Sequence, residues 1–195
     1  MKHLNCDTES KSGAQIIPAA AQAAPFLRRY AQQLIDSSHR APILDVACGS
    51  GRNALFLAEL GCEVFCLDRD LGQLEQILAS GTLRPAVAEK LRLCKLDLVS
   101  DPWPFEFQTA GGIINIHFTL AALFPCFGAA LLPGGCLLVE TVPAHGGNYL
   151  ELPRAGQLRS AFEDAFDLES YKERKVGPGN YDAVTVRLFA KRREA

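Results

Sequence analysis

Short apolar runs alternate with amphipathic segments along most of this sequence. Apolar runs at 42–47 and 63–68 enclose an amphipathic segment at 53–60, which ends at Gly61. Two apolar strands separated by a helix are typical of a βαβ unit, whose crossover is nearly always right-handed. The pattern therefore predicts that a parallel sheet begins at residue 42.

The same alternation continues through the middle of the chain. Helix-like segments near 71–79 and 120–131 alternate with apolar strands at 91–98, 111–118 and 136–142. Unbroken apolar runs of this kind are typical of parallel strands that are covered on both faces. We therefore expect an α/β fold with helices on both sides of the sheet.

The last third of the chain has a different pattern. A helix near 155–166 is followed by two alternating segments, 166–174 and 182–192, which are joined by the turn-rich VGPGNY. Strand-like segments joined in this way predict a hairpin. The hairpin would add an antiparallel strand to an otherwise parallel sheet.

The first forty residues read as a separate part. Residues 1–15 are polar and expected to be mobile, and Pro18 and Pro25 precede an alanine-rich helix around 26–35. We expect residues 1–40 to be an N-terminal polar arm and helix, for which a lid is one role left open. Residues 41–195 would form the main domain.

Composition narrows the classes of partner. The chain has 195 residues, 48% of them hydrophobic, which suits one domain with a sizeable core. A net charge of −2 gives no general basic field for nucleic acid or an anionic membrane. The basic runs at 28–29 and 191–193 are short and lack interleaved aromatic residues, so a solvated face is the favoured interpretation.

The sequence also indicates a cytoplasmic protein without a membrane span. Residues 1–15 lack the apolar region of a secretory signal. The uncharged stretch 118–139 is divided by Leu-Pro-Gly-Gly at 132–135 into a helix and a strand, each too short to cross a bilayer. The seven cysteines form no C-x-x-C pair, so we expect reduced packing thiols and no metal site.

The turn after the first strand is a candidate ligand site. Asp45 ends the strand, and Gly49 and Gly51 stand in the following A-C-G-S-G turn. Glycine permits positive φ and close approach of a ligand, while the helix that follows points free N–H groups at the same space. An acid at this place suits an ammonium or sulfonium group and would repel a pyrophosphate. A tight structural turn is the alternative.

Two further acids close the next strands. Asp68 ends the second strand, where a carboxylate can accept hydrogen bonds from both hydroxyls of a ribose. A helix N-cap is its alternative role, for which Asp70 is the better candidate. Asp97 stands between Leu96 and Leu98 and can receive the amino group of an adenine, although a strand-end aspartate is also a common turn residue.

Together these residues resemble the class I S-adenosylmethionine-dependent methyltransferases over residues 41–195. The matching elements are D-V-A-C-G-S-G, the acids after the second and third strands, and L-L-P-G-G before the fifth. DVACGSGRNALFLAELG is most similar to the small bacterial tellurite-resistance and thiopurine types. The departure is Ala47, where many members have glycine; alanine would be tolerated there if φ stays negative.

The resemblance implies a Rossmann-like, doubly wound, seven-stranded sheet with a reversed C-terminal strand. It also implies S-adenosylmethionine as cofactor and S-adenosylhomocysteine as product. Asp45 and the backbone of Ala47 and Gly49 would hold the methionine end, and Asp68 the ribose. The residues implied in cofactor binding are Asp45, Ala47, Gly49, Gly51, Asn53, Asp68, Arg69, Asp97, Leu98 and Asn115, with Arg69 flanking the adenine and Asn115 near the methyl group.

The expected activity is methyl transfer to a small-molecule acceptor. A nicotinamide-dependent oxidoreductase is an alternative, although Asp45 and the missing third glycine of G-x-G-x-x-G disfavour it. A non-catalytic sensor or partner domain that binds S-adenosylmethionine is another.

A general base is optional in this chemistry, because positioning alone contributes a large part of the rate. If a base is needed, His117 after the fourth strand and His145 after the fifth are the candidates. A wall residue is the alternative role of His117. Tyr149 and Arg154 would shape the acceptor pocket, and Glu140 faces either that pocket or the core.

Overall fold

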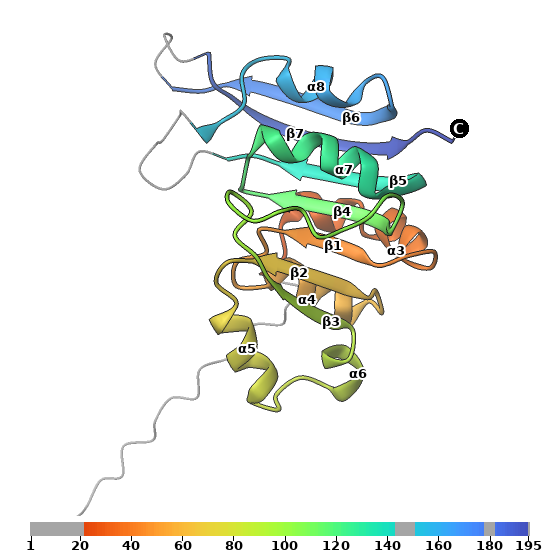
Figure 1. The fold of residues 1–195 in the computed structure, drawn as a ribbon, viewed down its shortest axis with the longest axis vertical. Helices are drawn as coiled ribbons and strands as arrows, with labels where there is room; N and C mark the ends of the chain where they lie inside the picture. The colour runs from red at the N-terminus through yellow and green to blue at the C-terminus, as the bar shows by residue number, and fades with distance from the viewer. Residues whose placement is uncertain (1–21, 143–150, 178–181, 195) are drawn as a thin grey trace, which may run out of the picture.

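One seven-stranded sheet runs through the molecule in the order β3-β2-β1-β4-β5-β7-β6 (Figure 1). The structure, a computed structural model, describes residues 22–142, 151–177 and 182–194. Neighbours among β1 to β5 are parallel, and β7 is antiparallel to both β5 and β6. This confirms the predicted fold class. The strands are β1 Ile43–Val46, β2 Val64–Asp68, β3 Leu91–Lys95, β4 Ala110–Ile116, β5 Leu131–Glu140, β6 Phe166–Lys175 and β7 Val184–Arg192.

Helices cover both faces of this sheet (Figure 1). Side chains of the helices from α2 to α6 pack in one apolar cluster with one face, while α7 and α8 pack in a second cluster with the other. The helices are α2 Pro25–Arg29, α3 Ala31–Ser38, α4 Arg52–Glu59, α5 Gly72–Ala79, α6 Pro85–Ala88, α7 Phe124–Ala130 and α8 Gln157–Phe162, with a 3-10 turn, η1, at Ala121–Leu123. None of the described helices is long and apolar enough to cross a bilayer.

The start of β5 differs from the expected strand at 136–142. The strand begins at Leu131, and Leu-Pro-Gly-Gly lies inside it instead of separating it from the helix before it. Ala110 of β4 pairs with Leu131 and Gly112 with Cys136, so residues 132–135 stand opposite Gly111 alone. The four residues therefore form a bulge, which Gly134 helps to turn with a φ of +75°.

Two helical predictions also need correction. The helix expected over 155–166 spans only Gln157–Phe162, and Phe166 opens β6 instead. The helix α6 at Pro85–Ala88 was not predicted, since four residues are too few to show a helical period.

The described part of the N-terminal region packs against the sheet. The helix expected over 26–35 is divided at Tyr30 into α2 and α3, and Leu27 and Leu34 are buried. The Tyr30 ring stacks on Phe189 of β7 with 4.0 Å between ring centroids. A lid formed by the first residues falls outside the described residues, and the boundary between residues 40 and 41 stays a prediction.

Helix α3 lies unusually close to β4 because of Gly111. A Cβ atom at this position would clash with the backbone carbonyl oxygens of Ser37 and Ala41. The glycine therefore lets the end of α3 rest directly on the strand beside β1, which fixes the position of the central strands.

Candidate functional site

The turn after β1 is built from three residues with left-handed backbone. Ala47, Gly49 and Gly51 have φ values of +60°, +53° and +77°. Gly51 is the N-cap of α4, so the first N–H groups of this helix point into the space above β1. A Cβ atom at Gly51 would lie 2.8 Å from Leu74, so this glycine also lets α5 pack against the turn.

The condition under which alanine would be tolerated at position 47, a negative φ, is not met. The turn is held by hydrogen bonds from Cys48 N to Leu67 O at 3.0 Å and from Gly51 N to Cys48 O at 3.0 Å. These bonds keep Ala47 in the left-handed region, which costs an L-residue about 1–2 kcal/mol. Alanine therefore occupies a position that glycine would fill without strain.

Asp45 lies beneath this turn with an unpaired carboxylate oxygen. Its side chain is only 1% exposed, and Oδ2 has no hydrogen-bond partner among the described residues. Burial raises the pKa of this carboxyl to about 7; the Ala54 N–H lowers the pKa, and the charge of Asp68 adds to the rise. Asp45 is thus a buried acid that titrates near neutral pH.

Asp68 ties the end of β2 to the first turn. Its Oδ2 accepts a hydrogen bond from Gly49 N at 2.8 Å, and its Oδ1 accepts one from Asp70 N at 3.0 Å. Asp70 in turn accepts from Gly72 N, the first residue of α5, at 3.0 Å. Asp70 therefore supports the start of the helix, although Leu71 and not Asp70 is the N-cap residue, and Asp68 is left facing the turn.

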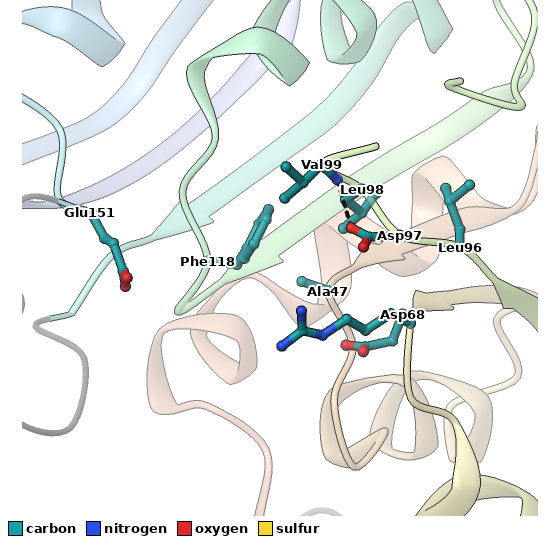
Figure 2. A pocket seen from close by; sticks show the side chains of 9 residues that line it. Ala47, Asp68, Leu96, Asp97, Leu98, Val99, Phe118 and Glu151 are labelled. Atoms are coloured by element: carbon teal, nitrogen blue, oxygen red, sulfur yellow. Dashed lines mark hydrogen bonds between the residues drawn. The ribbon is translucent and has the colours of Figure 1, made fainter. Parts of the chain in front are cut away.

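A cavity of about 400 Å³ lies at the carboxyl ends of β1, β2 and β3, and we call it the Asp68 cavity (Figure 2). Three carboxylates, those of Asp68, Asp97 and Glu151, and an apolar strip face it, as in a site for a ligand with both polar and flat apolar parts. Five residues assigned from the sequence meet here, namely Ala47, Asp68, Arg69, Asp97 and Leu98. The remaining lining residues are Leu96, Val99, Phe118 and Glu151.

Asp97 also has the turn geometry that its sequence context allowed. Strand β3 ends at Lys95, and Asp97 Oδ1 accepts a hydrogen bond from Val99 N at 3.0 Å. Its own N–H donates to Asp101 Oδ2 at 2.8 Å. The side chain is thus fixed by the turn while it borders the cavity.

Two asparagines assigned to the cofactor make bonds within the protein. Asn115 is buried, and its Nδ2 donates to the Val46 carbonyl oxygen at 3.0 Å across the β1–β4 pairing. Asn53 accepts from Ala24 N at 3.0 Å and so connects α4 to the residue before α2. Asp45, Gly51 and Asn115 line none of the cavities found among the described residues, whereas Asn53 does.

His117 stands just past β4 between two smaller cavities. One has a volume of about 320 Å³ and includes Ser50 and Asn53, and we call it the Ser50 cavity. The other, of about 240 Å³, includes Leu120 and is called the Leu120 cavity. His117 has a φ of +68°, and its N–H donates to Glu140 O at 2.7 Å. This hydrogen bond holds the backbone of His117 in place where the residue lines both cavities.

Three residues that the sequence interpretation did not select connect these cavities. Phe118 lines the Asp68, Ser50 and Leu120 cavities, and Val99 and Glu151 line both the Asp68 and Leu120 cavities. In Figure 2, Phe118 stands between Glu151 and the Asp97–Leu98 segment. The proximity of Phe118 to His117 in the sequence was the only hint available, because Val99 and Glu151 lie in loops without a motif.

The remaining assigned residues lie elsewhere. Glu140, for which the acceptor pocket and the core were both open, is buried with 3% of the residue exposed. Its Oε1 lies 2.7 Å from Arg187 Nε. Arg154 forms an isolated bridge with Ala183. His145 and Tyr149 fall outside the described residues. Within the described ranges, no group of three or more His, Cys, Asp or Glu side chains is placed to hold a metal ion.

The comparisons with known proteins agree with this geometry. The family model described as tellurite resistance protein TehB matches residues 31–99, which include β1, β2, β3 and the acids that follow them. No curated protein matches the sequence.

Solved structures match nearly the whole chain at low identity. A geranyl diphosphate methyltransferase in complex with S-adenosylmethionine has 15% identity and a TM-score of 0.62, covering 90% of this chain and 85% of its own. The N-methyltransferase NodS from Bradyrhizobium japonicum, with S-adenosylhomocysteine bound, has 15% identity and a TM-score of 0.56, covering 87% and 89%. The tRNA methyltransferase TrmI from Aquifex aeolicus has 14% identity and a TM-score of 0.59, covering 95% and 73%.

These neighbours act on unlike acceptors, so what they share with this chain is the architecture. The family match covers the strands that carry the first turn and its acids, and the structural matches extend the likeness to the C-terminal hairpin. The chain therefore has the fold of the class I S-adenosylmethionine-dependent methyltransferases, and its residues 31–99 match the TehB family model.

Proposed function

We propose that this protein transfers a methyl group from S-adenosylmethionine to a small-molecule acceptor. The observation that carries the proposal is the Asp68 cavity, where the ends of three parallel strands bring two carboxylates and an apolar strip together. Ligands of open parallel sheets bind at this edge, beside the point where the strand order reverses. Here that point is between β1 and β4.

The lining of the Asp68 cavity fits an adenosine. Asp68, Leu96 and Leu98 line the cavity, where Asp68 would accept hydrogen bonds from the ribose hydroxyls and the two leucines would contact a flat base. Asp97 Oδ1 is engaged by Val99 N, and its other oxygen would receive the amino group of the adenine. Arg69 completes the wall and would flank the ring.

The unpaired oxygen of Asp45 fits the methionine end. An ammonium group above the first turn would supply the positive partner that Oδ2 lacks among the described residues. The cofactor itself supplies a methyl group on a cationic sulfur, and the protein's part is to hold and orient the reactants. Gly49 leaves room for this approach, because a Cβ atom there would meet nothing within 4 Å.

The acceptor would enter through the Leu120 cavity. This cavity shares Val99, Phe118 and Glu151 with the Asp68 cavity, so an acceptor there would lie next to the methyl group. Most of its lining residues are apolar, and His117 is the candidate base for an acceptor that must lose a proton. The second candidate, His145, stays a prediction.

The ion pairs of the basic residues near the C-terminus favour a small acceptor over a nucleic acid. Lys191 lies 3.2 Å from Glu169, and Arg193 Nε lies 2.8 Å from Asp167. These ion pairs neutralise much of the cluster that would otherwise attract phosphates. The cytoplasmic location remains a prediction from the sequence.

Calorimetric titration with S-adenosylhomocysteine tests the cofactor assignment, with NAD and NADP titrated into the same protein as controls. We expect micromolar binding of the adenosyl ligand alone. Asp68→Ala should weaken this binding at least about tenfold, since it removes charge-assisted hydrogen bonds to the ribose. Asp70→Ala is the matched control, because Asp70 has the same charge but lines none of the described cavities.

Three results would argue against the proposal. Binding of a nicotinamide cofactor instead would favour the oxidoreductase. Equal weakening by Asp68→Ala and Asp70→Ala would remove the specific role of Asp68. Tight cofactor binding without transfer to any of a broad panel of thiols, amines and phenols would favour the non-catalytic binding domain.

A further inference from the structure

A further cavity, of about 450 Å³, lies between the end of β5 and the β6–β7 hairpin. We call it the hairpin cavity. Val142 lines both this cavity and the Leu120 cavity, so the two adjoin. The hairpin cavity therefore continues the path along which an acceptor would lie, away from the cofactor.

Three cations face the hairpin cavity from one side of the hairpin. Lys172 of β6 and Arg187 of β7 are cross-strand partners, and Arg174 stands opposite Thr185. Partners across strands, and residues two apart along a strand, share one face of a sheet. The three positive charges are therefore gathered on the face that borders the cavity.

One carboxylate of the hairpin, that of Glu173, also lines this cavity but is already engaged. Its Oε1 accepts hydrogen bonds from Gly156 N at 2.8 Å and from the Tyr171 hydroxyl. Among the described residues, Lys172 and Arg174 take part in no ion pair. The sequence segments 143–150 and 178–181, which lie outside the described residues, contain no acid.

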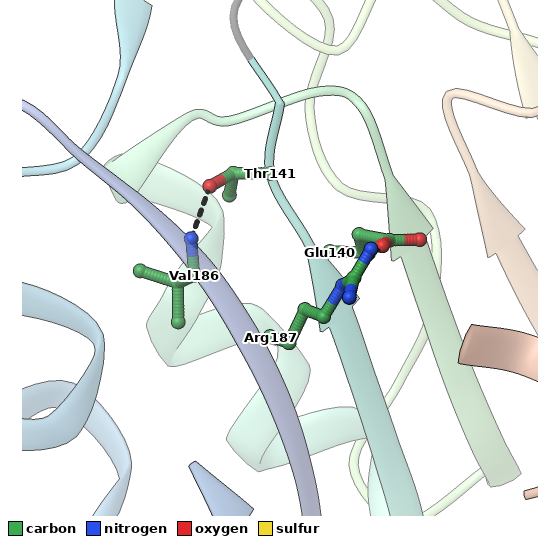
Figure 3. Close-up of polar contacts among 4 residues, drawn as sticks. All are labelled: Glu140, Thr141, Val186 and Arg187. Carbon is green, nitrogen blue, oxygen red and sulfur yellow. Dashed lines mark hydrogen bonds and ion pairs between the residues drawn. The ribbon is translucent and has the colours of Figure 1, made fainter. Parts of the chain in front are cut away.

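Arg187 is held in place by a buried acid (Figure 3). Glu140, at the end of β5, binds Arg187 through Nε alone at 2.7 Å, which leaves the terminal nitrogens of the guanidinium for another partner. Thr141 and Val186 fix the two strands beside it, with hydrogen bonds of 2.9 Å from Thr141 N to Val186 O and 2.8 Å from Val186 N to Thr141 Oγ1. Glu140 offsets one of the three charges, so two remain without an ion-pair partner in the part of the chain that the structure describes.

We propose that the hairpin cavity binds an anionic group of the acceptor, a carboxylate or a phosphate. Two strand spacings of about 4.8 Å separate β4, where the methyl group would be transferred, from β7, so the anion would lie about 10 Å from the methylated atom. Arginine and lysine side chains on adjoining strands suit such a group, since they can bind its oxygens from two sides. This inference rests on the proposed function, because it names the substrate class of the same site.

NMR titration of the isotopically labelled protein, saturated with S-adenosylhomocysteine at low ionic strength, tests the inference. Inorganic phosphate and acetate are the probes for the two sources of negative charge. We expect at least one of them to shift the Val142 and Thr185 amide signals in a saturable manner. The double variant K172Q/R174Q should weaken this binding about fivefold or more, because the anion loses its electrostatic attraction to two positively charged side chains.

Lys175→Gln is the matched control, because Lys175 lies next to Arg174, carries the same charge and faces the other side of β6. Its effect should stay below about twofold. A second series uses ω-mercapto carboxylates of increasing length and their methyl esters as ligands. Long acids should bind more tightly than their esters and shift the Phe118 signal together with that of Thr185, whereas short acids should shift only the latter.

Several results would overturn the inference. These are the absence of saturable shifts at Val142 and Thr185, equal binding of acids and esters, or equal effects of K172Q/R174Q and Lys175→Gln. Much tighter binding of an RNA oligonucleotide that depends on the same two cations would replace the small acceptor with a nucleic acid. Failure of the proposed function is distinguishable from failure of this inference. In the first case S-adenosylhomocysteine would not bind, while phosphate could still be titrated into the cofactor-free protein.

Discussion

At the scale of single residues, the first turn contains two local costs, a buried acid and a left-handed alanine. Asp45 is buried with one oxygen unpaired, and its pKa is raised from 3.8 to about 7. Ala47 has a φ of +60°. Costs of this kind collect at functional sites, where a ligand or a required geometry offsets them.

Asp45→Asn should change the pH dependence of stability. The folded state holds a proton on Asp45 between pH 4 and 7 that the unfolded state has lost, so the free energy of unfolding falls as pH rises through this range. The free energy of unfolding of the variant, minus that of the wild type, should therefore rise by on the order of 2 kcal/mol from pH 5 to pH 8. Urea denaturation at both pH values measures this gain.

The same variant should bind S-adenosylhomocysteine more weakly at pH 8, because the ammonium group loses an anionic partner. In the wild type, affinity should fall as the pH drops below about 7 and Asp45 takes up a proton. Parallel stability profiles for the variant and the wild type would show that Asp45 does not titrate in this range.

Ala47→Gly should stabilise the protein without loss of cofactor affinity. Glycine removes a backbone strain of about 1–2 kcal/mol from the folded state. It also makes the unfolded chain more flexible, which lowers the free energy of unfolding by about 0.4–1 kcal/mol. The net gain in the free energy of unfolding should be up to about 1 kcal/mol, measured by denaturant titration. A loss of stability would contradict the assigned left-handed conformation.

The sequence identified much of the candidate site because its residues follow strand ends in a repeated way. Asp68, Asp97 and Leu98 lie at such ends and meet around one cavity. Phe118 and Glu151 join it through loops whose path depends on packing, so no local pattern marked them. The φ of Ala47 could not be predicted from the sequence, because the hydrogen bonds donated by Cys48 N and Gly51 N, which close the turn, decide it.

At the scale of elements, the strongest departure from prediction is the bulge that enters β5. The pattern L-L-P-G-G was expected to separate a helix from a strand, because proline and glycine usually interrupt regular structure. The strand instead resumes its pairing after the bulge, with Gly112 opposite Cys136. Periodicity predicted the existence and type of the long elements, and it failed where sheet pairing outweighed local preference, as in this strand.

Gly111→Ala should destabilise the fold, because the added methyl group would clash with backbone atoms of α3 and the residues after it. We expect a loss of about 2–4 kcal/mol, at or above the usual cost of overpacking, since backbone yields less than a side chain. Gly128→Ala in α7 is the control, with its nearest contact a Phe166 ring atom at 3.9 Å. The control should be neutral or gain about 0.5–1 kcal/mol. Equal stability of both variants would contradict the close packing of α3 on β4.

At the scale of the whole molecule, the two apolar clusters lie on opposite faces of the same sheet. Neither cluster is complete without that sheet, so the described part of the chain is expected to unfold as one unit. The Asp68 cavity takes residues from both sides of the β1–β4 pairing, including Ala47 and Phe118. A ligand in this cavity should therefore stabilise the whole domain.

S-adenosylhomocysteine at about a hundred times its Kd should raise the free energy of unfolding by about 2.7 kcal/mol. For a chain of this size, the midpoint temperature should rise by about 5–10 °C in a single transition. Differential scanning calorimetry measures both the shift and the number of transitions. Asp68→Ala should remove most of the shift, and two separate transitions would contradict a single cooperative unit.

The strand order has a consequence for how such a protein can be recombined. Strands β1, β2 and β3 lie on one side of the β1–β4 junction and come from one continuous stretch of chain, while β4, β5, β6 and β7 lie on the other side and come from the next stretch. A chimera joined between residues 99 and 110 would keep Asp45, Asp68 and Asp97 and exchange the entire acceptor half. A graft that also retains Gly111 beneath α3 would preserve the junction, so acceptor preference is separable from cofactor recognition by one cut in the sequence.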